Sequence, residues 1–136
     1  MSHERSGIPH LTTSFAPGTI PNGGFFNFTS PALGAKDVIV LDPVTIRLKA
    51  GHTYLVEALV HSLGGNGVTR WTDTAGAPIG LVNHPWTTAT GLNNHHGHPF
   101  AIVVAAVDTD IRLQNLAGGN AAAQALDTVY IREIGL

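Results

Sequence analysis

The chain has 136 residues, of which 12% are charged and 43% are hydrophobic, and it contains no cysteine. The missing cysteines exclude a disulfide framework, a thiolate metal site and a cysteine nucleophile. The net charge of −2 and the scattered lysines and arginines argue against nucleic-acid binding. The absence of a long apolar run at the N-terminus or elsewhere argues against a secretory leader and a membrane span.

Residues 1–37 are rich in Gly, Pro, Ser, Thr and Asn, and we expect them to form an extended N-terminal arm. Four prolines at short intervals exclude a helix and discourage long strands. A disordered tail is the alternative that this composition leaves open. Phe25, Phe26 and Phe28 lie within four residues of one another, so we expect this patch to be buried against something.

The next segments show the two-residue period of β-strands. Val44, Ile46 and Leu48 alternate with polar residues, as in a strand with one buried and one solvated face. A glycine turn and a second, mostly apolar strand follow, which predicts a β-hairpin. Leu55 and Leu59 share one face of this second strand. We expect that face to be covered by the arm, by another layer of strands or by a second subunit.

Residues 38–136 contain further short β-type runs separated by turn residues, and we assign them to a single domain. The expected strands are Val38–Leu41, Val44–Lys49, Thr53–His61, Val68–Trp71, Ile79–Val82, Trp86–Thr90, Phe100–Val107, Ile111–Leu116 and Thr128–Ile134. The alanines of residues 121–125 are compatible with one turn of helix. The pattern predicts an all-β fold, an antiparallel jelly-roll β-sandwich of about eight strands.

One histidine-rich loop is the candidate for a metal site. His95, His96 and His98 are spaced as imidazole ligands of Zn, Cu or Ni can be. No acidic residue lies nearby in the sequence to orient them, and a polar loop tip explains them better. We therefore predict no metal site, with these three histidines as the residues to examine.

The sequence contains no clear catalytic motif. There is no Gly-x-Ser-x-Gly elbow, and the glycines of residues 64–67 precede a β-type segment rather than the helix that a phosphate loop requires. Asp108 and Asp110 fit turn positions better than a carboxylate pair. Trp71 and Trp86 fit a core better than a stacking platform. We predict neither an enzyme nor a cofactor.

Short motifs follow one another in a set order along the chain. They are Ala-Gly-His-Thr-Tyr at 50–54, Trp-Thr-Asp at 71–73, Ile-Gly at 79–80, Asp-Ile-Arg-Leu at 110–113 and Tyr-Ile-Arg-Glu-Ile at 130–134, with an apolar strand at 100–107. With this order, the stretch from Val44 to Ile134 resembles the tumour-necrosis-factor-like jelly rolls used in bacteriophage virion proteins. Within that group, so short a chain resembles a capsid cement, or decoration, protein.

The resemblance implies a structural virion protein that binds the outer surface of an assembled phage capsid and stabilises it by bridging major capsid protein subunits. The implied partners are the major capsid protein and further copies of the chain, in a homodimer or homotrimer. The low charge agrees with a subunit that functions inside an assembly, although a monomer with a neutral polar surface is also compatible with it. The interface candidates are Phe25, Phe26, Phe28, Asn93, Asn94, His95 and His96.

Two other functions are compatible with the same fold. The first is a tail-fibre head that recognises a receptor or a carbohydrate, since jelly rolls serve lectins. The second is a small cupin-like metal-binding enzyme, in which His84 joins the histidines of the loop and Glu57 supplies the carboxylate.

Overall fold

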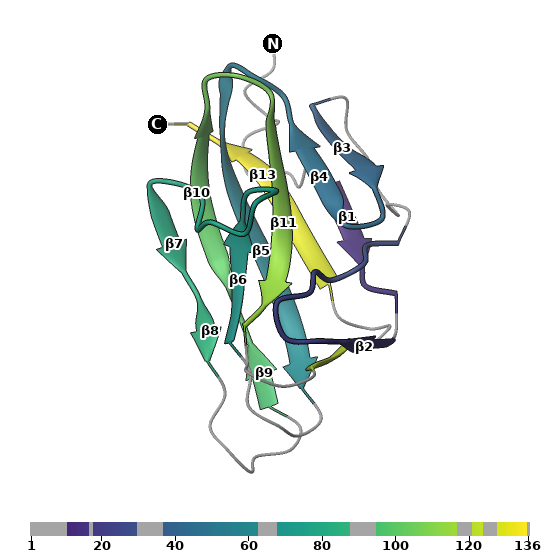
Figure 1. Ribbon diagram of the computed structural model, residues 1–136. Helices are drawn as coiled ribbons and strands as arrows, with labels where there is room; N and C mark the ends of the chain where they lie inside the picture. The colour runs from purple at the N-terminus through teal and green to yellow at the C-terminus, as the bar shows by residue number, and fades with distance from the viewer. Residues whose placement is uncertain are drawn as a thin grey trace.

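The structure is a computed structural model that describes residues 11–16, 18–29, 37–62, 68–87, 95–116, 121–123 and 128–135. At positions 61, 62, 68, 86, 87, 95–97 and 121–123 it describes the backbone alone. All regular elements within these ranges are β-strands, and most of them form two antiparallel sheets that pack face to face (Figure 1).

Six strands form the first sheet. They are, in spatial order, β1 (Leu11–Ser14), β13 (Thr128–Ile134), β5 (His52–Ser62), β10 (Phe100–Ala105) and β7 (Val82–His84), with β9 (His95–Gly97) paired to the end of β5. The central strand β5 pairs with β13 on one side and with β10 on the other.

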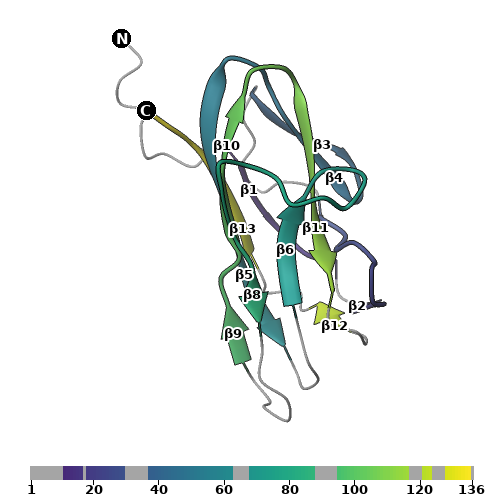
Figure 2. The same ribbon diagram turned by 60° about the vertical axis from the view of Figure 1, so that its left-hand side comes forward.

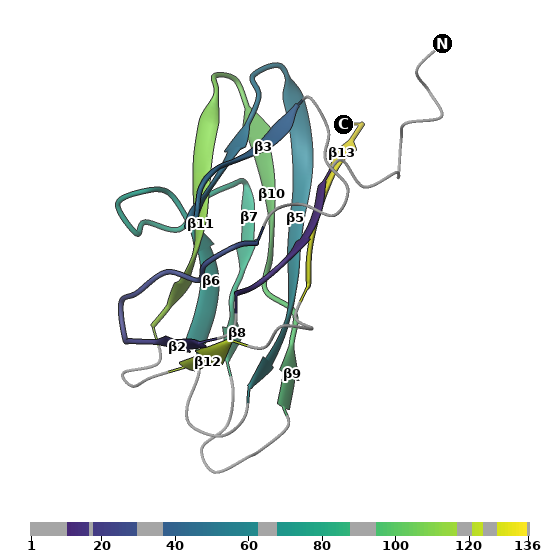
Figure 3. The same ribbon diagram turned by 90° about the vertical axis from the view of Figure 1, so that its right-hand side faces the viewer.

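Five strands form the second sheet. They are, in spatial order, β3 (Val38–Asp42), β4 (Thr45–Leu48), β11 (Thr109–Asn115), β6 (Val68–Thr72) and β8 (Trp86–Thr87). A two-stranded ribbon of β2 (Gly18–Ile20) and β12 (Ala121–Ala123) lies near one end of the sandwich. Figures 2 and 3 show the two sheets as separate layers. The predicted all-β jelly-roll class is confirmed.

The two layers enclose a core to which both sheets contribute alternate residues. Tyr54, Val56, Ala58 and Val60 point inward from β5 and are buried. Trp71 is also buried, as predicted, and its Nε1–H donates a hydrogen bond to the carbonyl of Pro99, 3.2 Å away. Because successive side chains of a strand point to opposite faces, the residues between these on β5 face outward.

Residues 11–29 belong to this sandwich, so the expected arm is wrong for this stretch. Strand β1 pairs with β13 at the edge of the six-stranded sheet (Figure 3). Phe15 and Phe26 are fully buried with ring centroids 5.1 Å apart, and Phe28 stacks on Trp71 with centroids 6.3 Å apart. The expected boundary between residues 37 and 38 therefore divides a single core. Residues 1–10 and 30–36 lie outside the described residues.

The expected hairpin after Val44 is also wrong, because its two strands lie in different sheets. Strand β4 pairs with β3 and β11, whereas β5 pairs with β10 and β13. Gly51, at φ +96°, makes the turn between them and donates its N–H to the carbonyl of Ala105. The buried Tyr54 hydroxyl donates to the carbonyl of Lys49 at 2.9 Å and holds this corner closed.

Two smaller expectations need correction. The strand expected at Ile79–Val82 begins only at Val82, because Gly80 turns the chain at φ +100°. The alanines of residues 121–123 form a strand rather than a helical turn, because they pair with β2. The chain then changes sheet at Pro85, between β7 in the first sheet and β8 in the second. Proline has no N–H to donate and is suited to such an interruption.

Truncating a core phenylalanine tests whether the N-terminal stretch is part of the fold. We expect Phe15→Ala to lower the free energy of unfolding by about 3–5 kcal/mol, because it leaves a cavity between the sheets. Denaturant unfolding followed by circular dichroism measures this change. Leu81→Ala is the control, since Leu81 is 73% exposed and should change stability by less than about 0.5 kcal/mol. Equal effects of the two substitutions would show that residues 11–29 are a detachable arm.

Tyr54 predicts a loss of stability in alkaline solution. Burial raises the pKa of its hydroxyl, and the carboxylates of Asp37, Glu133 and Asp108 raise it further. Because an unfolded tyrosine titrates near pH 10, the contribution of the protonated Tyr54 hydroxyl to the free energy of unfolding is fully present below about pH 10. It is lost as the pH rises above this value. Unfolding measured as a function of pH should show a decline that Tyr54→Phe removes. An unchanged decline in Tyr54→Phe would contradict this assignment.

Candidate interaction surface

The structure does not assemble a metal site from the histidine loop in the part of the chain that it describes. His98 lies beside Glu57, with His98 Nε2 and Glu57 Oε2 2.7 Å apart. His95 and His96 belong to β9, where their backbones pair with the end of β5, and their side chains lie outside the description. No group of three or more His, Asp and Glu side chains suited to a metal ion occurs among the described residues. Asn93 and Asn94 lie outside the described residues.

The two candidate carboxylates near the β10–β11 turn have separate structural partners. Asp108 accepts a hydrogen bond from the backbone N–H of Ala50 at 2.9 Å, which agrees with the predicted turn role. Asp110 instead accepts two hydrogen bonds from Arg47, at 2.8 and 3.1 Å, across the β4–β11 pair. Neither carboxylate is left to act in a catalytic pair with the other.

The three phenylalanines proposed as interface residues have different environments. Phe26 and Phe28 are 0% and 5% exposed, so they are core residues and cannot contact a partner in the folded chain. The sequence shows that such rings need burial but does not show that their own sandwich buries them. Phe25 is half-buried, with the guanidinium of Arg112 5.1 Å from its ring centroid. Only Phe25 of the three remains near the surface.

The outer side of the second sheet is mostly polar, although Ile39 of β3 is exposed beside Arg47. Arg47 and Asp110 form their bidentate pair on it, and Arg112 donates from Nε to the hydroxyl of Thr45 at 2.9 Å. The Asp73 carboxylate turns the β6–β7 connection by accepting two backbone N–H groups. This side therefore shows the polar surface that an antiparallel sheet presents to water.

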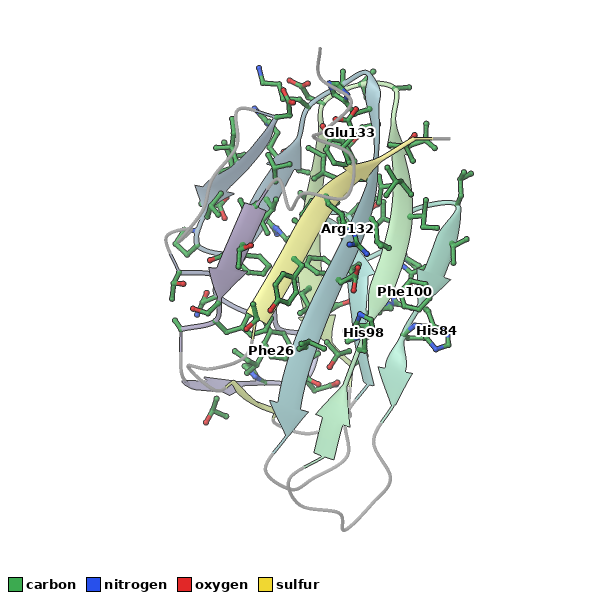
Figure 4. All side chains as sticks on the ribbon, turned by 180° about the vertical axis from the view of Figure 1, so that it is seen from behind. Phe26, His84, His98, Phe100, Arg132 and Glu133 are labelled. Atoms are coloured by element: carbon green, nitrogen blue, oxygen red, sulfur yellow. The ribbon has the colours of Figure 1, made fainter. Side chains whose placement is uncertain are left out.

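The outer side of the six-stranded sheet is different, because apolar side chains predominate on it. We call it the outer sheet face, and its residues on β5, β7, β10 and β13 are Thr53, Leu55, Glu57, Leu59, Val82, His84, Phe100, Ile102, Val104, Thr128, Tyr130, Arg132 and Ile134. Figure 4 looks onto this face. Leu59, Val82 and Val104 are 46%, 44% and 49% exposed, and the other apolar members are half-buried by their neighbours.

The strand register brings these residues together from four strands. Leu55 lies between Ile102 and Arg132, and Glu57 lies between Phe100 and Tyr130. Neighbouring strands about 4.8 Å apart, with about 3.3 Å per residue over seven residue positions, give this four-stranded face an area of roughly 450 Å². Monomeric soluble proteins rarely expose contiguous apolar patches larger than a few hundred Å². The outer sheet face therefore has the character of an interaction surface.

A compact polar cluster lies within this apolar surface. Glu57 Oε1 accepts a hydrogen bond from Arg132 Nη2 at 3.3 Å, and Glu57 Oε2 pairs with His98 Nε2 at 2.7 Å. The imidazole of His84 stacks on Phe100 with ring centroids 5.1 Å apart. Figure 4 shows His98, Phe100, His84 and Arg132 side by side on the sheet. The sequence contains no spacing signal for this cluster, since its members come from separate strands.

The sequence predicts only the part of this surface that lies on β5. Its pattern marks Leu55 and Leu59 as one face that must be covered by the arm, by another layer of strands or by a second subunit. Residues 11–29 pair at the edge of the sheet or lie between the sheets, and the second sheet packs on the opposite side. Among the described residues, nothing covers this face. The contributions of β10, β13 and β7 were missed because their pairing with β5 is not visible in the sequence.

Comparisons with known proteins identify the fold class. No protein-family model matches the sequence, and no curated protein matches it. The globular domain of the zebrafish complement 1qA protein has a similar structure, with a TM-score of 0.60 and 11% identity over 89% of this chain and 94% of that one. The PRD1 vertex protein P5 has a TM-score of 0.51 and 15% identity over 95% of this chain and 100% of that one.

A carbohydrate-binding module of Cellvibrio mixtus lichenase 5A, in complex with cellotriose, has a TM-score of 0.47 and 16% identity over 94% of this chain and 100% of that one. The first two structures, at their low identities, show that the chain shares their overall fold. The described residues include no helix long and apolar enough to cross a membrane.

Proposed function

We propose that this chain is a structural protein of a bacteriophage virion, which assembles with copies of itself and binds the outer surface of the capsid. There it bridges neighbouring major capsid protein subunits. The observation that carries the proposal is the outer sheet face, a broad apolar surface on a chain with only 12% charged residues. The proposal assigns the chain no catalytic step, cofactor or metal.

The area of the outer sheet face is compatible with weak self-association. Two faces of roughly 450 Å² would bury about 900 Å² together, which is in the range of weak or transient protein–protein contacts. Leu59 and Val104 become buried in such a contact without any loss of hydrogen bonds. The polar outer side of the second sheet stays in water and keeps the assembly soluble.

Two further observations support the location in a phage virion. The motifs between Val44 and Ile134 resemble phage virion jelly rolls, and the PRD1 vertex protein P5, which is a phage protein by its name, has a similar structure. A homo-oligomer bound to a symmetric shell makes several contacts at once, so modest contacts add up through avidity. If the protein binds the assembled shell and not its separated subunits, it stabilises the shell by mass action.

The capsid-binding residues that we propose are fewer than the sequence candidates. Phe26 and Phe28 are removed because they are buried in the core. Phe25 remains, and so do Asn93, Asn94, His95 and His96.

A charge placed on the outer sheet face tests self-association. We expect Leu59→Glu to weaken the oligomer by about 100-fold or more, because a carboxylate would be buried without a partner. Analytical ultracentrifugation over a wide concentration range measures the effect. Ile39→Glu is the matched control, since Ile39 is 41% exposed on β3 of the other sheet and should leave association unchanged. A wild-type protein that stays monomeric, or equal effects of both substitutions, would contradict self-association through this face.

Co-sedimentation with assembled capsids of the phage that encodes the chain tests the capsid role. We expect the wild-type protein to pellet with the shells and Leu59→Glu to pellet less, because a monomer loses avidity. Alanine at Asn93, Asn94, His95 and His96 together should reduce binding while the oligomer persists. An oligomer that stays in the supernatant with intact shells would exclude the capsid role.

A further inference from the structure

The polar cluster on the outer sheet face occupies a central position. Glu57 lies on β5 between Phe100 of β10 and Tyr130 of β13, and its side chain is 18% exposed. The preceding and following outward residues of β5 are Leu55 and Leu59. Any partner that covers the apolar surface must therefore also cover this carboxylate and its cationic neighbours.

The hydrogen-bonding capacity of the cluster is only partly used within one chain. Each oxygen of Glu57 has one partner, Arg132 or His98, although a carboxylate can accept about four hydrogen bonds. A guanidinium carries five N–H donors, and one N–H of Arg132 is used by Glu57. The side chains of Arg132 and His98 are 40% and 49% exposed, so water solvates the rest.

A purely apolar partner would remove this water and leave the donors of Arg132 unpaired. Burying the remaining N–H donors without acceptors carries a large desolvation cost. The covering surface must therefore carry a carboxylate or similar acceptor that is surrounded by apolar side chains. A second copy of this chain meets the requirement, since its own Glu57 has unused acceptor positions within the same apolar surround.

We propose that Glu57 and Arg132 determine how the copies align when they associate through the outer sheet face. This inference rests on the self-association proposed above. In the aligned contact, Arg132 of each copy donates to Glu57 of its neighbour while the pairing within each chain persists. His98 holds Glu57 Oε2 and so keeps the carboxylate in place between the two arginines.

Alignment needs such a device because apolar contact is not directional. Leu59, Ile102 and Val104 provide attraction in several registers of one sheet against another, and these differ little in buried area. The charged cluster excludes the shifted registers, because each of them buries Arg132 against aliphatic side chains. A single buried polar contact that selects one register and one oligomer size is known from coiled coils.

Removing one charge should therefore weaken association, and removing both should relax its specificity. We expect Glu57→Gln and Arg132→Gln each to weaken the oligomer by about 30-fold or more, because each leaves the other charge unpaired at the contact. The double variant Glu57→Leu/Arg132→Leu should associate within about tenfold of the wild type or more tightly. It should also form a mixture of oligomer sizes. Sedimentation velocity and native mass spectrometry measure affinity and size, and circular dichroism confirms the fold.

The control is Asp110→Asn, which breaks the bidentate pair with Arg47 on the other side of the sandwich. It should leave association unchanged. Glu57→Gln and Arg132→Gln each remove one of the two charges of the same contact. The test therefore needs only one of these two variants to fold. The inference is overturned if both behave like Asp110→Asn, or if the double variant keeps a single oligomer size.

The failure of this inference is distinguishable from failure of the proposed self-association. If the wild-type protein associates and Leu59→Glu dissociates it, while Glu57→Gln does not, the face is the interface but the charged cluster does not align it. If the wild-type protein is monomeric, both proposals fail together.

Discussion

The two-sided character of β5 is the constraint on which the rest of the structure depends. This strand lies in the middle of the six-stranded sheet, and its inward residues Tyr54, Val56 and Ala58 form the core. Its outward residues include Leu55 and Leu59. A strand with apolar side chains on both faces is stabilised by a layer on each side. The second sheet provides one layer, and the other is provided, in our proposal, by a second copy of the chain.

The N-terminal stretch illustrates the same demand for burial within one chain. A composition rich in proline and glycine is typical of an arm, and the backbone of residues 18–29 is indeed mostly irregular. Phe15, Phe26 and Phe28 nevertheless occupy the core beside Trp71, because exposure of three large rings would be costly. Irregular backbone is compatible with a core position here because its N–H groups are paired, as Phe26 is with the carbonyl of Leu113.

The two outer sides of the sandwich differ in polarity. One side carries Arg47, Asp110 and Arg112 in local pairs, and the other carries a continuous apolar surface with a single charged cluster at its centre. The jelly-roll fold is shared with proteins of very different roles, so it does not by itself select a function. The function proposed here rests instead on this surface and on the small number of charges available to solvate it.

The sequence by itself determined the all-β class and the longer strands. The alternation at Val44–Leu48 and the closing strand at Thr128–Ile134 were predicted closely, because the period of two is a local property of an extended backbone. The same alternation marked Leu55 and Leu59 as a face in need of cover. Only the tertiary structure decided which strands pair, that β4 and β5 belong to different sheets, and that Phe26 is core. It also decided that Glu57, Arg132 and His98 meet, because strand pairing joins residues far apart in the chain through contacts that no local pattern encodes.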